Sequence, residues 1–183
     1  SAGVVKIHNS EKAIGASTDC NPLYIRINPE KGMIYTVLEA YRNLIASNIK
    51  PMAITNNLNF ASPLDPNIMG EIVLSISGLS DIAKKLDTPI VSGNVSLYNQ
   101  TNDRPINPTP VIGMVGCNSN WKKLLQNKFI KENDELIILG KSLDSDFSPY
   151  FLQDQKITSS ICEFNELLAP DIDLEIKNAK FIQ

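Results

Sequence analysis

The sequence predicts an α+β fold for residues 1–117, followed by an incomplete α/β domain over residues 118–183. Three features predict this division: short β-prone runs at the start, two amphipathic helical patterns that alternate with apolar strands, and a polar break at residues 118–120. The second unit is too short to bury an independent core, so we expect it to be only the beginning of a domain.

The first predicted elements are a β-hairpin and a helix. Residues 4–7 and 13–18 favour strands, and the polar stretch 9–12 between them predicts a tight connection. From residue 33 to residue 47, apolar side chains recur three and four positions apart, which predicts an amphipathic helix. Asn48 follows the last apolar position and can end this helix in the left-handed conformation.

A second helix is expected between two short strands. Residues 51–55 predict the first strand, and residues 89–91 predict a second, buried strand. Between them, Asp65 is a suitable N-cap and Pro66 suits the first helical position, where its missing N–H costs nothing. Apolar residues then keep helical spacing to residue 86, the clearest periodic signal in the chain.

Three further elements are predicted with weaker patterns. Residues 111–115 form an apolar run typical of a strand, and residues 135–139 favour another strand that ends in a glycine. Residues 147–152 are compatible with a short helix. The last two belong to the incomplete second domain.

Composition excludes several classes of function. The 183 residues carry a formal net charge of −3 without long charged runs, which disfavours binding to nucleic acid or to an acidic membrane surface. His8 is the single histidine, so a mechanism that needs two imidazoles is excluded for this chain alone. The three cysteines are far apart in sequence, and no apolar stretch is long enough to span a membrane. A reducing cytoplasm is the expected location.

Two polar segments follow the predicted strands and are candidates for a ligand site. Residues 56–60 and 92–96 are expected to be loops that contain asparagine, glycine and serine. Asparagine oxygen can bind Mg²⁺, and glycine lets backbone N–H groups approach a phosphate, but the same residues also stabilise ordinary turns. Neither segment has the phosphate-binding motif GxxxxGK[ST] or the dinucleotide motif GxGxxG.

One charged pair on the first helix also has two interpretations. Glu39 and Arg42 are three residues apart, a spacing that allows a local ion pair on the helix surface. Contact with a substrate is the alternative interpretation.

Four segments resemble one enzyme family. They are EAYRN at residues 39–43, KPMAITNNLNF at 50–60, DTPIVSGNVSLYN at 87–99 and PTPVIGMVG at 108–116. Together they resemble the second half of the large subunit of phosphoribosylformylglycinamidine synthase. The resemblance implies the fold of aminoimidazole ribonucleotide synthase, in which the sheet of an α+β N-terminal domain pairs with a sister domain and an α/β domain follows.

The resemblance also implies an activity and a set of site residues. The family uses ATP and Mg²⁺ to convert formylglycinamide ribonucleotide to the amidine, with ammonia supplied by a glutaminase subunit and with a small accessory subunit. It implies that Asn56 and Gly93 bind the nucleotide, Asn94 binds magnesium and Ser96 binds the substrate. Asn56 stands where the family usually has aspartate, so the site carries one negative charge fewer.

The family's catalytic histidines lie in its first half, and His8 lies outside any matching motif. We therefore expect no catalytic residue in this chain, an incomplete active site, and no activity without the missing first half. A non-catalytic remnant or interaction domain with the same fold is the main alternative, and a self-sufficient ATP-using enzyme is a weaker one. An unpaired sheet edge also predicts a homo-oligomer formed through the first domain.

Overall fold

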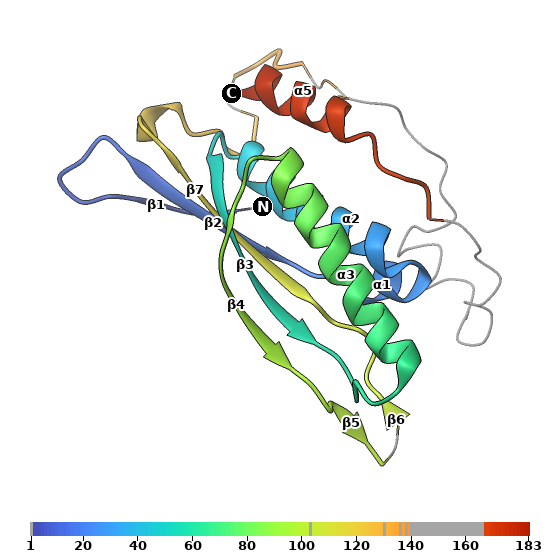
Figure 1. Ribbon diagram of the computed structural model, residues 1–183. Helices are drawn as coiled ribbons and strands as arrows, with labels where there is room; N and C mark the ends of the chain where they lie inside the picture. The colour runs from blue at the N-terminus through green and yellow to red at the C-terminus, as the bar shows by residue number, and fades with distance from the viewer. Residues whose placement is uncertain (1, 103, 130, 136, 138, 140–166) are drawn as a thin grey trace.

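The computed structural model describes residues 2–102, 104–129, 131–135, 137, 139 and 167–183 (Figure 1). The strands are β1 (Gly3–Lys6), β2 (Ala13–Asp19), β3 (Lys50–Asn59), β4 (Ile90–Ser96), β5 (Gln100–Thr101), β6 (Arg104–Pro105) and β7 (Val111–Asn118). The helices are α1 (Pro22–Ile27), α2 (Pro29–Ile45), α3 (Pro66–Lys85), the 3₁₀ helix η1 (Trp121–Lys123) and α5 (Ile172–Ile182).

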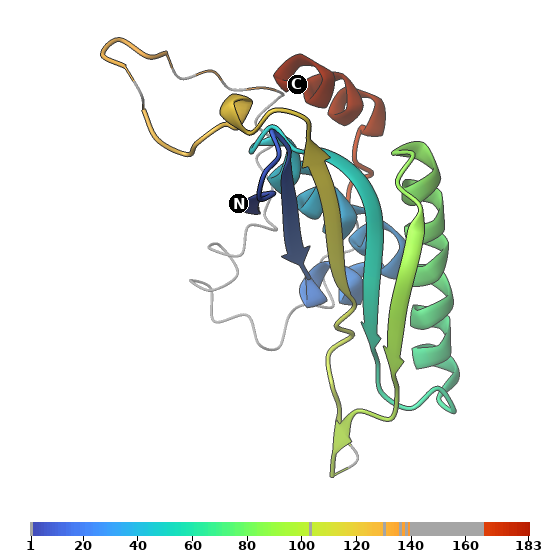
Figure 2. The ribbon, with the colours of Figure 1, turned by 90° about the vertical axis from the view of Figure 1, so that its left-hand side faces the viewer.

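Five strands form one sheet in the order β1-β2-β7-β3-β4. All neighbours are antiparallel except β3 and β4, which run parallel and are joined by the long crossover through α3. Helices α1, α2 and α3 lie on one side of this sheet (Figures 1 and 2). The α+β architecture expected for residues 1–117 is therefore confirmed.

Each of the three helices begins at an asparagine or aspartate followed by proline. The side chains of Asn21, Asn28 and Asp65 accept hydrogen bonds from backbone N–H groups in the first turns of α1, α2 and α3, at 3.1, 2.9 and 2.9 Å. The cap predicted at Asp65 is confirmed. The start predicted for α2 at residue 33 is wrong by one turn, because Asn28-Pro29 begins the helix and does not merely interrupt the chain.

The core lies between the helices and the covered face of the sheet. Helix α2 contributes Met33, Leu38 and Leu44, and the sheet contributes Ile54 and Ile112, all with fully buried side chains. Burying an apolar side chain of this size stabilises a fold by roughly 1.5–3 kcal/mol. Packing of α2 against the sheet therefore contributes substantially to the stability of this domain.

The opposite face of the sheet is exposed and partly apolar. The exposed fractions are 71% for Val5, 49% for Ile14, 53% for Met52 and 41% for Val115. In β2 and β7 these residues alternate with buried ones, as expected for strands with one covered face. This apolar surface is compatible with the sheet pairing implied by the family resemblance.

Both polar segments that were expected to be loops are strands. Residues 56–59 continue β3, and residues 92–96 continue β4, because the two segments pair with each other from Thr55 to Asn59 and from Ser92 to Ser96. The pairing satisfies backbone groups that a turn would have left to side chains. The expectation of a buried strand at residues 89–91 is also wrong, since Ile90 and Val91 are 43% and 65% exposed.

The described part of residues 118–183 is small. It contains η1 and α5. A strand was predicted at 135–139, but residues 135, 137 and 139 have no strand structure, and the other two positions lie outside the described residues. The helix predicted at 147–152 also lies outside them. Helix α5 lies against α2, where Glu175 accepts two hydrogen bonds from the guanidinium of Arg42. None of the helices in the described ranges has the length and apolar character needed to cross a membrane.

Candidate functional site

Strands β3 and β4 place the four expected site residues side by side. In the parallel register, Asn56 is opposite Gly93, Asn57 opposite Asn94, and Asn59 opposite Ser96. These residues occupy the final part of both strands, at the carboxyl edge of a parallel pair. Ligands of α/β sheets commonly bind at such an edge.

The alternation of side chains divides the expected site between the two faces of the sheet. Asn56 lies between the buried residues Ile54 and Leu58 in β3 and therefore shares their covered face. Gly93 belongs to the same face, because a β-carbon on it would lie 2.8 Å from Oδ1 of Asn56. The two residues expected to bind the nucleotide are thus direct neighbours.

Asn94 belongs to the open face. Its Nδ2 donates a hydrogen bond of 3.0 Å to Oδ1 of Asn57, and one step earlier along the strands Ser92 Oγ donates a 2.7 Å bond to Thr55 Oγ1. These cross-strand bonds fix the polar side chains in a row. The expected metal ligand and the expected nucleotide-binding pair therefore face opposite sides of the same two strands.

Ser96 is held by the turn that follows β4. The side-chain amide of Asn99 donates to the carbonyl of Ser96 at 2.9 Å, to the carbonyl of Phe60 at 3.0 Å and to Ser96 Oγ at 3.1 Å. The backbone N–H of Phe60 in turn donates to the carbonyl of Ser96 at 3.0 Å. This network joins the ends of the two strands and fixes the Ser96 hydroxyl.

The strand pair offers neutral oxygen and nitrogen atoms and no formal charge. Neither β3 beyond Lys50 nor β4 contains an acidic, basic or histidine residue. The described ranges also contain no cluster of three or more His, Cys, Asp and Glu side chains able to hold a metal ion. The Oδ1 atom of Asn94 suits Mg²⁺ as one hard ligand, but the negative charge that such a site needs would come from a phosphate ligand or another polypeptide.

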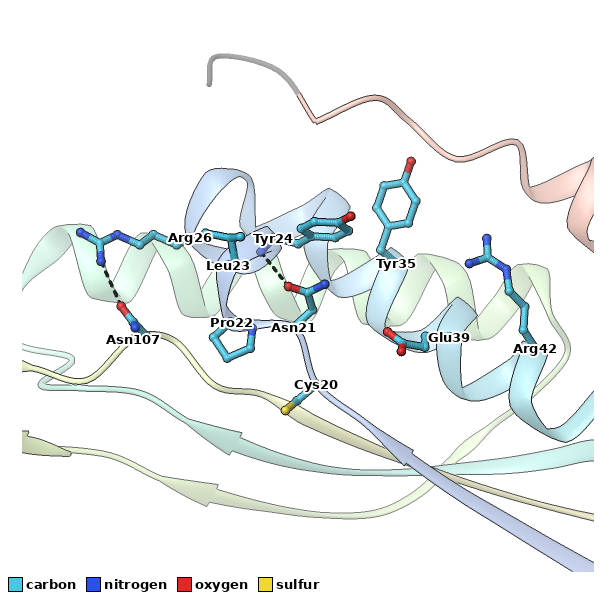
Figure 3. A pocket seen from close by; sticks show the side chains of 10 residues that line it. All are labelled: Cys20, Asn21, Pro22, Leu23, Tyr24, Arg26, Tyr35, Glu39, Arg42 and Asn107. Carbon is cyan, nitrogen blue, oxygen red and sulfur yellow. Dashed lines mark hydrogen bonds between the residues drawn. The ribbon is translucent and has the colours of Figure 1, made fainter. Parts of the chain in front are cut away.

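A cleft lies away from this strand pair, where β2 ends and α1 and α2 begin (Figure 3). It has a volume of about 800 Å³. Its lining residues are Cys20, Asn21, Pro22, Leu23, Tyr24, Arg26, Tyr35, Glu39, Arg42 and Asn107. None of the four expected site residues lines this cleft, and sequence analysis did not identify it as a cavity.

In this cleft, Arg42 does not form the local ion pair that was expected with Glu39. Arg42 pairs with Glu175 of α5, 133 positions away, through bonds of 2.9 and 2.5 Å to its two carboxylate oxygens. Glu39 instead lies near Asp19, whose carboxylate accepts bonds of 3.1 and 3.2 Å from Asn43 Nδ2. Partial burial, and then repulsion by Asp19, raise the pKa of Glu39, while Arg42 lowers it.

Replacing Glu39 by glutamine should stabilise the fold at neutral pH. Because the pKa of Glu39 is higher in the folded state, its ionisation costs stability as pH rises through and above its unfolded value. Glu39→Gln removes this cost, and we expect a small gain because the side chain is only partly covered and solvent screens its charge. Urea unfolding at pH 7 and pH 3.5 should show the gain only at pH 7. An equal gain at both pH values would contradict the electrostatic explanation.

The fold and the paired strands can be compared with known proteins. The family model described as "AIR synthase related protein, N-terminal domain" matches residues 1–117. The chain belongs to this family. The matched range coincides with the α+β domain that contains β3 and β4, so the AIR synthase related domain includes the entire candidate site.

Relatives of this AIR synthase related chain are synthase subunits. It is 37% identical over 187 residues to phosphoribosylformylglycinamidine synthase subunit PurL of Leuconostoc mesenteroides, an alignment that covers 99% of this chain and 25% of the relative. It is 44% identical over 141 residues to PurL of Caulobacter vibrioides, covering 77% of this chain and 19% of that protein. The chain thus spans about a quarter or less of these relatives.

Solved structures agree with this relationship. Phosphoribosylformylglycinamidine synthase II from Thermotoga maritima has a TM-score of 0.62 and 30% identity, covering 69% of this chain and 21% of its own. A complex of the protein named AaThiL with AMPPCP and TMP has a TM-score of 0.61 at 14% identity, covering 98% of this chain and 56% of its own. The second comparison shows only that the AIR synthase related fold is shared.

Proposed function

We propose that this chain supplies part of the nucleotide- and substrate-binding wall of a phosphoribosylformylglycinamidine synthase. The reaction uses ATP to phosphorylate the glycinamide carbonyl oxygen of formylglycinamide ribonucleotide. Ammonia then adds to that carbon and the oxygen leaves as phosphate, which gives the amidine and ADP. The observation that carries the proposal is the register of β3 and β4, which pairs Asn56 with Gly93 on one face and Asn57 with Asn94 on the other, both beside the edge strand of the sheet. Relatives named PurL, and T. maritima PurL complexes with ATP and with FGAR, support it.

Each of the four residues has a distinct role in this proposal. Gly93 leaves room for the side chain of Asn56, whose Oδ1 would lie only 2.8 Å from a β-carbon at position 93, and the Asn56 amide held there forms hydrogen bonds to the nucleotide. Because β4 is the edge strand of the sheet, the triphosphate would pass over this edge to the open face, where Asn94 Oδ1 contributes one ligand to the Mg²⁺ that accompanies ATP and neutralises phosphate charge. The Ser96 hydroxyl, oriented by Asn99, binds the ribonucleotide.

The remaining catalytic groups come from other parts of the enzyme. His8 lies in the turn after β1, and the sheet order places β1 at the opposite edge from β4. It is therefore far from the expected site. We infer that the chain acts in the cytoplasm, together with the first half of the synthase, a glutaminase and a small accessory subunit. The structure of PurLQS from T. maritima supports the existence of such partners. The exposed face formed by Val5, Ile14, Met52 and Val115 would pair with a sister sheet or with a second copy of the chain.

Two measurements test the proposal. Calorimetry should detect weak binding of Mg-ATP to the full chain, with a clear loss for Asn94→Ala and no change for Asn67→Ala, an exposed asparagine in the first turn of α3. The chain alone should produce no amidine from ammonia and ATP. Replacing the matching quarter of L. mesenteroides PurL by this chain should give an active synthase.

The possible results distinguish the alternatives. Conversion of substrate by the isolated chain would contradict the incomplete site. A folded chimera without activity, together with no binding of Mg-ATP to the chain, would refute the proposed role and favour a non-catalytic domain with the same fold.

A further inference from the structure

Tyr98, in the turn after β4, has a left-handed backbone conformation with φ of 60°. The other non-glycine residues with positive φ in the described part of the chain are Asn9, Asn48, Asp87, Asn102 and Asn133. Asparagine and aspartate tolerate this conformation because their short polar side chains can bond to the local backbone. A tyrosine cannot do so, and its backbone is strained there. The residue type at position 98 is therefore unfavourable for the turn itself.

The surrounding hydrogen bonds force this conformation on Tyr98. Its backbone N–H donates to the carbonyl of Ala61 at 3.1 Å, and the next N–H, of Asn99, donates to the carbonyl of Phe60 at 3.2 Å. The side-chain amide of Asn99 adds bonds to the carbonyls of Phe60 and Ser96. The backbone of the turn is thus fixed on both sides of residue 98, whatever side chain it carries.

Burial of the tyrosine ring does not compensate for the strain. Tyr98 is 58% exposed, whereas its neighbour Leu97 packs against the core. A smaller residue would satisfy the same turn with less strain, and Tyr98 belongs neither to the buried core nor to the partly buried residues packed against it. Strained residues that the fold does not need are concentrated where ligands bind.

We propose that Tyr98 contacts the base of the bound nucleotide and stacks its ring on that planar group. The inference rests on the function proposed above. Tyr98 follows Ser96 by two residues, at the carboxyl edge of the parallel strands that carry Asn56, Gly93 and Asn94. An exposed aromatic ring stacks on planar rings without needing charge, as aromatic residues do on nucleic-acid bases. ATP contains such a ring, whereas formylglycinamide ribonucleotide has none.

The test distinguishes binding of the nucleotide base from binding of its phosphates. Calorimetry on the full chain would compare Mg-ATP with Mg-triphosphate, which lacks the base, for wild type, Tyr98→Phe and Tyr98→Asn. We expect Tyr98→Asn to weaken binding of Mg-ATP about tenfold and to leave Mg-triphosphate unchanged, since one stacked base contributes on this scale. Tyr98→Phe keeps the ring and should bind ATP as wild type does. Asn102→Gly, at another exposed left-handed position, is the matched control and should change neither affinity.

Thermal unfolding without ligand supplies an independent result. Tyr98→Asn should raise the unfolding temperature by about 2 °C, because asparagine relieves the strain. A lower unfolding temperature would mean that the tyrosine supports the fold, and would overturn the inference. So would equal losses of affinity for ATP and triphosphate, or ATP affinity unchanged by Tyr98→Asn. No ATP binding to the wild-type chain would instead refute the proposed function, and the inference with it.

Discussion

Gly78→Ala is expected to destabilise the fold by about 3 kcal/mol, the upper range for overpacking a tight core. Gly78 lies in the buried part of α3, where its backbone touches the backbone of Glu30 in α2. A β-carbon at position 78 would overlap the Glu30 carbonyl oxygen. A flexible side chain could relieve such an overlap by changing its rotamer, but a helix backbone cannot. The two helices must separate, and contacts between them are lost.

The same helix contains a matched control. Gly70 also lies within α3, but a β-carbon there would have no atom within 4 Å. Gly70→Ala should therefore stabilise the protein by roughly 0.5–1 kcal/mol, the gain from better helix propensity. Urea unfolding followed by circular dichroism would measure both variants. If the two substitutions changed the unfolding free energy by similar amounts, close packing of α3 on α2 would not explain the effect of Gly78→Ala.

Local sequence signals predicted much of this fold. The hairpin of β1 and β2, the aspartate cap at the start of α3 and the left-handed Asn48 after α2 depend on residues close together in the chain. Such features are encoded by spacing and by the chemistry of one or two side chains. The short helix α1 was missed because six residues are too few for a periodic pattern, although Asn21-Pro22 is the same start signal as Asp65-Pro66.

Features that depend on distant partners were not predictable in this way. Asn56, Asn57, Gly93 and Asn94 favour turns locally, but pairing between segments 37 positions apart makes them strands. The register shift between Ile54 and Thr55 also helps to set which residues meet across the two strands, and no local pattern marks it. For the same reason the bond between Arg42 and Glu175 could not be anticipated. The family resemblance identified the site residues, but the division between two faces required the structure.

Asn99→Asp should be more damaging than Asn99→Ala, even though aspartate has almost the same shape as asparagine. The amide of Asn99 donates to two carbonyl oxygens, those of Phe60 and Ser96. A carboxylate cannot donate, so it would place negative charge against both oxygens, whereas alanine only removes the bonds. We expect a loss of about 2 kcal/mol for alanine and about 3 kcal/mol for ionised aspartate, from the usual cost of unsatisfied partly buried groups.

Lowering the pH should reverse part of the destabilisation caused by Asn99→Asp. When the carboxyl group is protonated it has one O–H donor, so it can restore one of the lost bonds. The difference in unfolding free energy between Asn99→Asp and Asn99→Ala should therefore shrink or change sign between pH 7 and pH 3.5, as urea unfolding would measure. Asn102→Asp, an exposed site that tolerates either residue, should show no such pH dependence relative to wild type. If Asn99→Asp were as stable as wild type at pH 7, the amide would not be holding the end of β4, and Ser96 would lack the support that its proposed role requires.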